Sequence, residues 1–127
     1  NITVCSIVGN FLEHSRIFYF ENDGEPQIFM GSADWMPRNL DRRVEILFPV
    51  EDEKLKARIC HILEVQLADN VKAQYLRPDG TYANRNRRGK EPVCAQDTFC
   101  AEAVQAAKEA GKKQDPAAMR VFIPLEQ

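Results

Sequence analysis

The chain has 127 residues and a mass of 14.5 kDa, with 44% apolar residues, 28% charged residues and a formal net charge of −2. These are ordinary globular proportions, and a chain of this length buries enough surface to form a core without disulfide bonds. No apolar run in the sequence approaches the roughly 20 residues of a membrane crossing, and the first residues lack the pattern of a secretory signal. We expect one cytoplasmic domain, or part of one, cut from a longer protein because the sequence starts abruptly, without Met.

The N-terminal half begins with strand patterns. Residues 3–8 are apolar and β-branched and precede a turn, which predicts a strand. Residues 17–20 are apolar on both faces, so we expect a second strand in the centre of its sheet. Asn22-Asp23-Gly24 supplies the positive-φ residues of a hairpin connection, and residues 27–30 are predicted to return antiparallel.

A strand and a helix follow. Residues 44–48 are predicted to form a strand with one buried face, because apolar side chains alternate with polar ones, Arg43 and Glu45 among them. Asp52 is a suitable N-cap, and apolar residues recur at helical spacing from there to Leu67. This spacing predicts the clearest helix of the chain.

The C-terminal half is predicted to contain a hairpin and a second helix. Residues 71–76 and 81–83 flank the turn Pro78-Asp79-Gly80, which is typical of a hairpin connection. A basic stretch comes next, composed of Arg85, Arg87, Arg88 and Lys90. A helix is expected after Pro92 as far as about Ala110, with Gly111 as its stop. Residues 112–127 mix charges, prolines and the apolar run Val121-Phe122-Ile123, and predict no definite structure.

The four cysteines show no metal-site or disulfide pattern. They are scattered, without a CxxC pair, at Cys5, Cys60, Cys94 and Cys100. Because free cysteines usually behave as small apolar side chains, we expect buried or half-buried thiols in a reducing compartment.

The two histidines lie in different settings. His61 falls inside the helix that follows Asp52, with no partner nearby in sequence, and we expect a structural or solvent-edge role. His14 precedes the strand at residues 17–20. Because side chains alternate along a strand, His14 and Arg16 are predicted to share one side, which favours binding of phosphate. Two solvated polar residues at a strand end are the alternative.

A second polar cluster follows the next strand. Gly31-Ser32-Ala33-Asp34 combines small residues with a hydroxyl and free amides, which permits close approach of a phosphoryl oxygen. Arg38 comes shortly after it, and Arg43 and Glu45 repeat the same-side spacing of the first cluster. A solvated loop with ordinary arginine–carboxylate pairs is the alternative reading.

The two clusters together resemble half of a phospholipase-D-like active site, in which an HxK pair is followed by a GSxN-type element. Here Arg16 replaces the usual Lys and Asp34 replaces the usual Asn. Those departures are typical of one family. Residues 6–17 (SIVGNFLEHSRI) and 31–45 (GSADWMPRNLDRRVE) look like the C-terminal domain of bacterial polyphosphate kinases. The resemblance continues to about residue 110, and the tail after Gly111 lies outside it.

The resemblance implies a mixed α/β fold, namely part of a phospholipase-D-like sandwich with a mixed sheet of four or five strands and two main helices. Residues 1–111 would form most of the C-terminal catalytic domain, and residues 112–127 a tail. It implies an ATP:polyphosphate phosphotransferase that works reversibly, through a phosphohistidine and with Mg²⁺. The nucleophilic histidine and most contacts to Mg²⁺ and the nucleotide would lie in other domains of the same enzyme.

The resemblance also assigns residues. His14 matches the second active-site histidine of the family, which holds the phosphate and donates a proton. Arg43 matches a phosphate-binding arginine, and Glu45 an acidic neighbour that orients an arginine or the imidazole. Geometry adds weaker candidates for the same ATP and phosphate pocket: Arg16, Ser32 and Arg38. The basic stretch is a weak candidate for the polyphosphate path, through Arg85, Arg87 and Arg88.

The expected partners are ATP or ADP, inorganic polyphosphate and the other domains of a homo-oligomeric enzyme, without a nucleic acid, a transmembrane segment or a metal site in this chain. The chain alone is expected to be inactive. Two alternatives stay open: a phospholipase-D-like phosphodiesterase, and a non-catalytic module that binds polyanions through the basic stretch.

Overall fold

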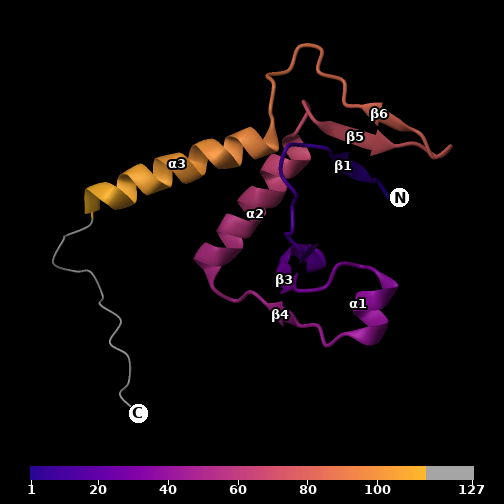
Figure 1. Ribbon diagram of the computed structural model, residues 1–127, viewed down its shortest axis with the longest axis horizontal. Helices are drawn as coiled ribbons and strands as arrows, with labels where there is room; N and C mark the ends of the chain where they lie inside the picture. The colour runs from indigo at the N-terminus through magenta and orange to yellow at the C-terminus, as the bar shows by residue number, and fades with distance from the viewer. Residues whose placement is uncertain (114–127) are drawn as a thin grey trace.

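The computed structural model describes residues 1–113 (Figure 1). The apolar run at residues 121–123, and almost all of the expected tail, lie outside the described residues. No helix among residues 1–113 is both long enough and apolar enough to cross a membrane.

The described residues form two separate antiparallel sheets of three strands each. One sheet has the order β1-β5-β6, with β1 at Cys5–Ile7, β5 at Ala73–Leu76 and β6 at Tyr82–Asn84. The other has the order β2-β3-β4, with β2 at Ile17–Phe20, β3 at Gln27–Gly31 and β4 at Leu47–Pro49. The expected single mixed sheet of four or five strands is therefore wrong, although a mixed α/β composition is confirmed.

The β2–β3 hairpin forms where the sequence predicts it, but β2 lies at the edge of its sheet and not in the centre. The connection contains a short 3₁₀ turn, Asn22–Gly24, in which all three residues have positive φ (47°, 54° and 89°). The central strand is β3, whose Ile28 is 2% exposed. Its side chain packs with Val50 and Ile59 in a small core. Ile17 of β2 is partly buried against this core, whereas Tyr19 and Phe20 at the other end of β2 are exposed.

A short helix that the sequence pattern did not predict, α1 (Pro37–Arg42), precedes β4. Pro37 occupies its first turn, where a missing N–H costs nothing. Because α1 continues to Arg42, the next residues serve as a link to β4, and the strand starts only at Leu47. The expected strand at residues 44–48 with one buried face is therefore wrong, and Val44 is 99% exposed.

Two longer helices complete the fold: α2 (Glu53–Ala68) and α3 (Ala95–Lys113). The Asp52 carboxylate caps α2 by accepting hydrogen bonds from the N–H groups of Lys54 (2.9 Å) and Leu55 (3.0 Å), as predicted. In Figure 1, α2 runs from the β4 end toward β1 and β5, and α3 leads away from them. The helix α3 passes through Gly111, so the predicted stop at that residue is wrong.

Asp69 joins α2, β5 and α3. Its carboxylate is fully buried and accepts four backbone hydrogen bonds: from Val71, Lys72 and Ala73 on Oδ1, and from Ala95 on Oδ2. Burial raises the pKa of Asp69, but the bond from Ala95 and those from Lys72, Ala73 and Val71 outweigh it, so the net pKa lies below the ordinary value of 3.8. The start of α3 is thereby fixed to the end of α2.

We expect Asp69→Asn to destabilise the chain by about 1–3 kcal/mol, because the amide nitrogen would face the Ala95 N–H and leave a buried donor unpaired. Urea unfolding at pH 7 measures this loss. A folded-state pKa below 3.8 means that the stability from the Asp69 carboxylate is complete above that pH and disappears as the pH falls through the lowered value. The difference in free energy of unfolding between the wild type and Asp69→Asn should therefore decrease in acid.

Asp79→Asn is the matched control, since Asp79 lies in the exposed hairpin turn and accepts its side-chain hydrogen bonds within residues 1–113 from Thr81. An equal loss of stability in the two variants would contradict the role given to the Asp69 junction.

Candidate functional site

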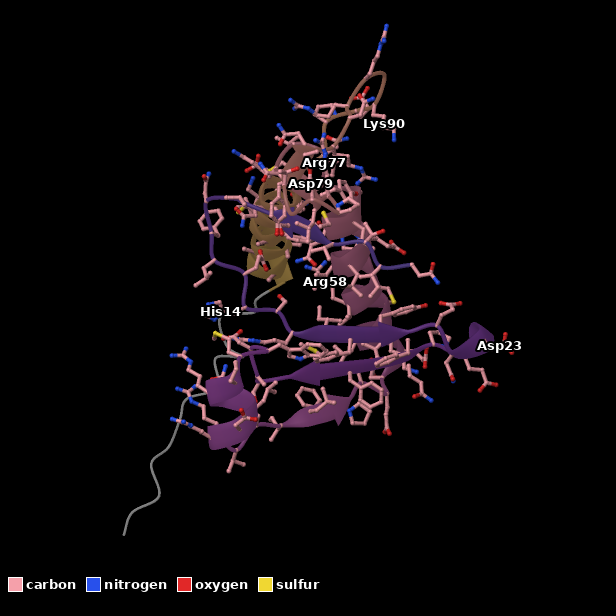
Figure 2. The ribbon with its side chains drawn as sticks, turned by 90° about the vertical axis from the view of Figure 1, so that its right-hand side faces the viewer. His14, Asp23, Arg58, Arg77, Asp79 and Lys90 are labelled. Carbon is pink, nitrogen blue, oxygen red and sulfur yellow. The ribbon has the colours of Figure 1, made fainter. Side chains whose placement is uncertain are left out.

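His14 lies in the loop of residues 8–16 that connects β1 to β2, and its side chain is exposed (Figure 2). Because β2 starts only at Ile17, neither His14 nor Arg16 is part of a strand. The predicted alternation that places both side chains on one side of a strand is therefore wrong. Instead, the Arg16 guanidinium turns back and Nη1 donates a hydrogen bond to the His14 carbonyl oxygen (2.7 Å).

Arg16 also connects the two polar clusters. Its Nε and Nη2 both donate to Asp34 Oδ1, at 2.9 Å and 2.6 Å, and the Gly31 N–H donates to the Arg16 carbonyl oxygen. The loop before β2 and the segment after β3 therefore lie side by side. Every nitrogen of the guanidinium has a protein partner, so in this arrangement Arg16 fixes the backbone of His14.

Ser32 holds the link between α1 and β4. Its hydroxyl donates to Glu45 Oε2 (2.5 Å) and accepts from the Ile46 N–H (3.0 Å), while the Ser32 N–H donates to the Ile46 carbonyl oxygen. Ser32 and Glu45 are thus brought together across 13 residues of sequence. Arg43 follows α1 directly, in extended conformation. Because β4 starts only at Leu47, neither Arg43 nor Glu45 lies in a strand, and the two share no strand face.

Three arginines near this link have no side-chain partner within residues 1–113. They are Arg38 in the first turn of α1, Arg42 in its last turn and Arg43 directly after it; all three are exposed, and none forms an ion pair or a side-chain hydrogen bond with the described residues. Figure 2 shows nitrogen-tipped side chains around α1, on the same side of the view as His14. Free guanidinium groups on an exposed helix and loop are suited to an anionic ligand.

Asn39 is a structural residue of this region that the sequence pattern did not reveal. It is 2% exposed, and its Nδ2 donates to the Asp34 carbonyl oxygen (3.1 Å). Its Oδ1 is buried and has no hydrogen-bond partner among the described residues. The aromatic ring of Trp35 stacks on Phe18 of β2, with ring centroids 5.7 Å apart. Both contacts fix the segment that carries Asp34.

The basic stretch lies elsewhere. In Figure 2, Lys90 is at the opposite end of the view from α1, well away from His14. Arg85 is half-buried there: its Nη1 donates to the carbonyl oxygens of Leu67 and Asp69, and its guanidinium lies over the Tyr75 ring. Arg87 and Arg88 are exposed. Of the three arginines, these two have side chains available to a ligand.

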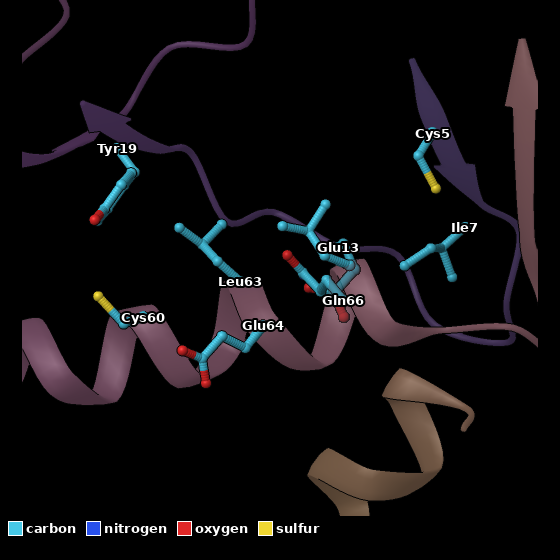
Figure 3. A pocket seen from close by; sticks show the side chains of 9 residues that line it. Cys5, Ile7, Glu13, Tyr19, Cys60, Leu63, Glu64 and Gln66 are labelled. Atoms are coloured by element: carbon cyan, nitrogen blue, oxygen red, sulfur yellow. The ribbon is translucent and has the colours of Figure 1, made fainter. Parts of the chain in front are cut away.

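A cavity of about 520 Å³ lies between β1, β2 and α2 (Figure 3). Its lining is mainly apolar and includes two carboxylates, those of Glu13 and Glu64, without a lysine, arginine or histidine among the lining residues. This chemistry does not suit phosphate. The candidate site is therefore the exposed surface formed by the His14 loop, the segment after β3 and α1, and not this cavity.

His61 has a partner that the sequence could not reveal. Its Nε2 lies 2.6 Å from Glu102 Oε1, and Arg58 Nη1 donates to the other oxygen of Glu102 (3.1 Å). The hydrogen bond from His61 lowers the pKa of Glu102, burial opposes this effect, and Arg58 adds to the lowering. These contacts connect α2 with α3, which agrees with the structural role expected for His61.

The described residues contain no group of three or more His, Cys, Asp or Glu side chains that could hold a metal ion. The four cysteines are free thiols, three of them half-buried and Cys100 exposed.

The fold and the site together define a small α/β domain that displays a histidine on one loop and exposed arginines on the helix α1 and directly after it, an arrangement suited to anionic substrates. The family model described as polyphosphate kinase C-terminal domain 2 matches residues 1–96. The chain therefore belongs to the polyphosphate kinase family.

Relatives and a solved structure agree with this assignment. The chain is 49% identical over 126 residues to a polyphosphate kinase of Lactiplantibacillus plantarum, covering 98% of this chain and 18% of that protein. It is 55% identical over 100 residues to a polyphosphate kinase of Pseudomonas putida, covering 78% of this chain and 14% of that protein. The crystal structure of polyphosphate kinase from Porphyromonas gingivalis is similar with a TM-score of 0.77 and 39% identity, over 87% of this chain and 17% of that one.

The chain spans less than a fifth of the length of these relatives. The alignment with the Lactiplantibacillus plantarum protein covers 98% of the chain, so similarity continues beyond residue 110, where the expected resemblance ended.

Proposed function

We propose that the chain acts as part of an ATP:polyphosphate phosphotransferase, which reversibly moves the terminal phosphate of ATP onto inorganic polyphosphate through a phosphohistidine. Its membership of the polyphosphate kinase family supports this proposal. The observation that carries it for this chain is the His14–Arg16–Asp34 contact, because it holds the His14 loop against the GSAD segment and leaves the imidazole exposed.

In this proposal His14 is not the nucleophile, which lies in another domain of the enzyme. An imidazole can carry either protonation state near neutral pH, so His14 holds an oxygen of the transferring phosphate and donates a proton to the departing group. Phosphoryl transfer depends mainly on positioning and on offsetting charge. Arg16 supplies positioning here, because its bond to the His14 carbonyl oxygen fixes the loop backbone.

Arg43 and Arg38 are proposed to offset the charge of ATP and the transferring phosphate, because both guanidinium groups are exposed and unpaired within residues 1–113. Glu45, held by the Ser32 hydroxyl, fixes the link that carries Arg43. Arg87 and Arg88 are proposed to line the polyphosphate path, while Arg85 holds the start of their loop through its contacts with α2 and Asp69. Mg²⁺ accompanies ATP and is held mainly outside this chain.

The proposal includes a phospholipase-D-like sandwich completed by other parts of the enzyme, a homo-oligomeric state and a cytoplasmic location. The two antiparallel sheets and the flanking helices are compatible with the partial sandwich.

The test of this function is an assay of the full-length protein that carries this chain. We expect it to form polyphosphate from ATP and, with excess ADP, to form ATP from polyphosphate. A phosphodiester substrate should not be cleaved, because Arg16, which replaces the lysine usual in hydrolases, is bound to Asp34. Diesterase activity without phosphate transfer would support the hydrolase instead. Salt-sensitive binding of polyanions with neither activity would support a non-catalytic module.

A further inference from the structure

We propose that Gln96 is a positioning residue for His14: it holds the loop between β1 and β2 in the conformation that presents the imidazole. This inference rests on the proposed function, in which His14 acts on the transferring phosphate. Gln96 is the second residue of α3 and lies more than 80 positions from the loop in sequence.

The carboxamide of Gln96 forms three hydrogen bonds with the loop backbone. Its Oε1 accepts from the N–H groups of Asn10 (2.7 Å) and Phe11 (3.1 Å), and its Nε2 donates to the Phe11 carbonyl oxygen (2.7 Å). Gln96 is only 6% exposed. Because the loop is neither helix nor strand at this point, the carboxamide supplies partners that a strand ladder would otherwise provide.

Gly9 makes room for this side chain. A Cβ atom at Gly9 would collide with Gln96 Oε1 and lie 2.8 Å from Nε2, closer than real side chains approach. The φ of Gly9 is not positive, so the requirement for glycine here is contact with the carboxamide and not backbone strain. Gly9 and Gln96 therefore form a matched pair.

Two anchors enclose His14. Gln96 fixes the backbone at Asn10 and Phe11, and Arg16 fixes the His14 carbonyl oxygen. The backbone that carries Gln96 is itself fixed, because the N–H of Ala95, the preceding residue, donates to the buried Asp69 carboxylate. Holding a reacting group in place lowers the entropic part of the barrier, and a misplacement of about 1 Å costs up to about 100-fold in rate.

The first experiment is Gln96→Leu in the full-length kinase. The leucine is close in size and removes all three hydrogen bonds. We expect kcat for polyphosphate synthesis to fall by about 10-fold to 100-fold while KM for ATP changes by less than about 2-fold, because a positioning defect acts on the transition state and not on substrate binding. The matched control is Gln105→Leu on the exposed face of α3, where the side chain donates one hydrogen bond, to Glu109, among the described residues. Equal kcat in the Gln96→Leu variant and the control would overturn the inference.

A double-mutant cycle with His14→Ala shows whether Gln96 acts through His14. If it does, Gln96→Leu in the His14→Ala background lowers kcat no further. A full multiplicative loss would overturn the inference while leaving the proposed function intact. If His14→Ala alone keeps near-normal synthesis, the role proposed for His14 fails instead, so the two failures are distinguishable.

Gly9→Ala and Gln96→Glu give a measurement that does not depend on activity. The methyl group that Gly9→Ala introduces displaces the carboxamide, whereas the glutamate keeps the acceptor for Asn10 and Phe11. We expect amide hydrogen exchange at Asn10 and Phe11 to accelerate by about tenfold or more in Gly9→Ala and less in Gln96→Glu. Gly9→Ala also serves if Gln96→Leu fails to fold. Unchanged hydrogen exchange at Asn10 and Phe11 in Gly9→Ala would refute the inference that Gln96 holds this loop.

Discussion

Replacing His14 with alanine in the full-length kinase should lower the rate of polyphosphate synthesis by at least about 100-fold, because general acid–base assistance by a positioned imidazole contributes about 10²–10⁴-fold. The fold should be unaffected, since the His14 side chain is exposed and forms none of the described hydrogen bonds. Initial rates of ATP-dependent synthesis, with the melting temperature measured in parallel, check both parts.

His61→Ala is the matched control for this experiment. His61 bonds to Glu102 between α2 and α3, so its loss should lower the melting temperature and leave the activity per folded molecule close to that of the wild type. Near-normal synthesis by the His14→Ala variant would refute the role proposed for His14.

The isolated 127-residue chain should show no transfer of phosphate from ATP to polyphosphate, because we propose that the nucleophile and most nucleotide contacts belong to other domains of the enzyme. The chain spans 18% of the Lactiplantibacillus plantarum relative. An assay with labelled ATP, using the full-length kinase as positive control, measures this difference. Detectable transfer by the purified chain would mean that the nucleophile is among these residues.

The features predicted correctly from sequence are those with local causes. Asp52 caps α2 because its carboxylate reaches N–H groups two and three residues away. The Asp79-Gly80 turn and the positive-φ connection at Asn22–Gly24 likewise depend on the preferences of a few adjacent residues. The periodic apolar positions of α2 add a signal over several turns.

The errors concern contacts between distant segments. The pattern of residues 17–20 indicates a strand with two apolar faces, but only pairing decides that β2 is an edge and β3 the centre. The alternation of apolar and polar residues at 44–48 is typical of a strand, but most of this segment is an exposed link. The pattern gives no sign of α1, which starts at Pro37 and delays the strand to Leu47. Gly111 lowers helix propensity without ending α3.

In the candidate site too, the sequence predicts the motifs but not the contacts that distant residues make with them. The meeting of the His14 and GSAD clusters is predicted from motif and resemblance, and the Arg16–Asp34 contact confirms that they adjoin. Nothing in the spacing indicates Gln96 or Asn39, because a neutral amide at an unremarkable helical position carries no compositional signal. Their contribution depends on hydrogen bonds that exist only after the chain has folded.

The Asp69 junction has a consequence for how the chain tolerates changes of length. The Asp69 carboxylate binds the backbone N–H groups of both Ala73 and Ala95. The segment between them, which contains the hairpin turn and the basic stretch, is therefore a loop whose two ends are held at the same residue. Lengthening a flexible loop costs only about 0.6 kcal/mol for each doubling. Insertions at Asp79-Gly80 should therefore leave the His14 surface undisturbed, which makes this turn the place to graft an epitope or a fluorescent label.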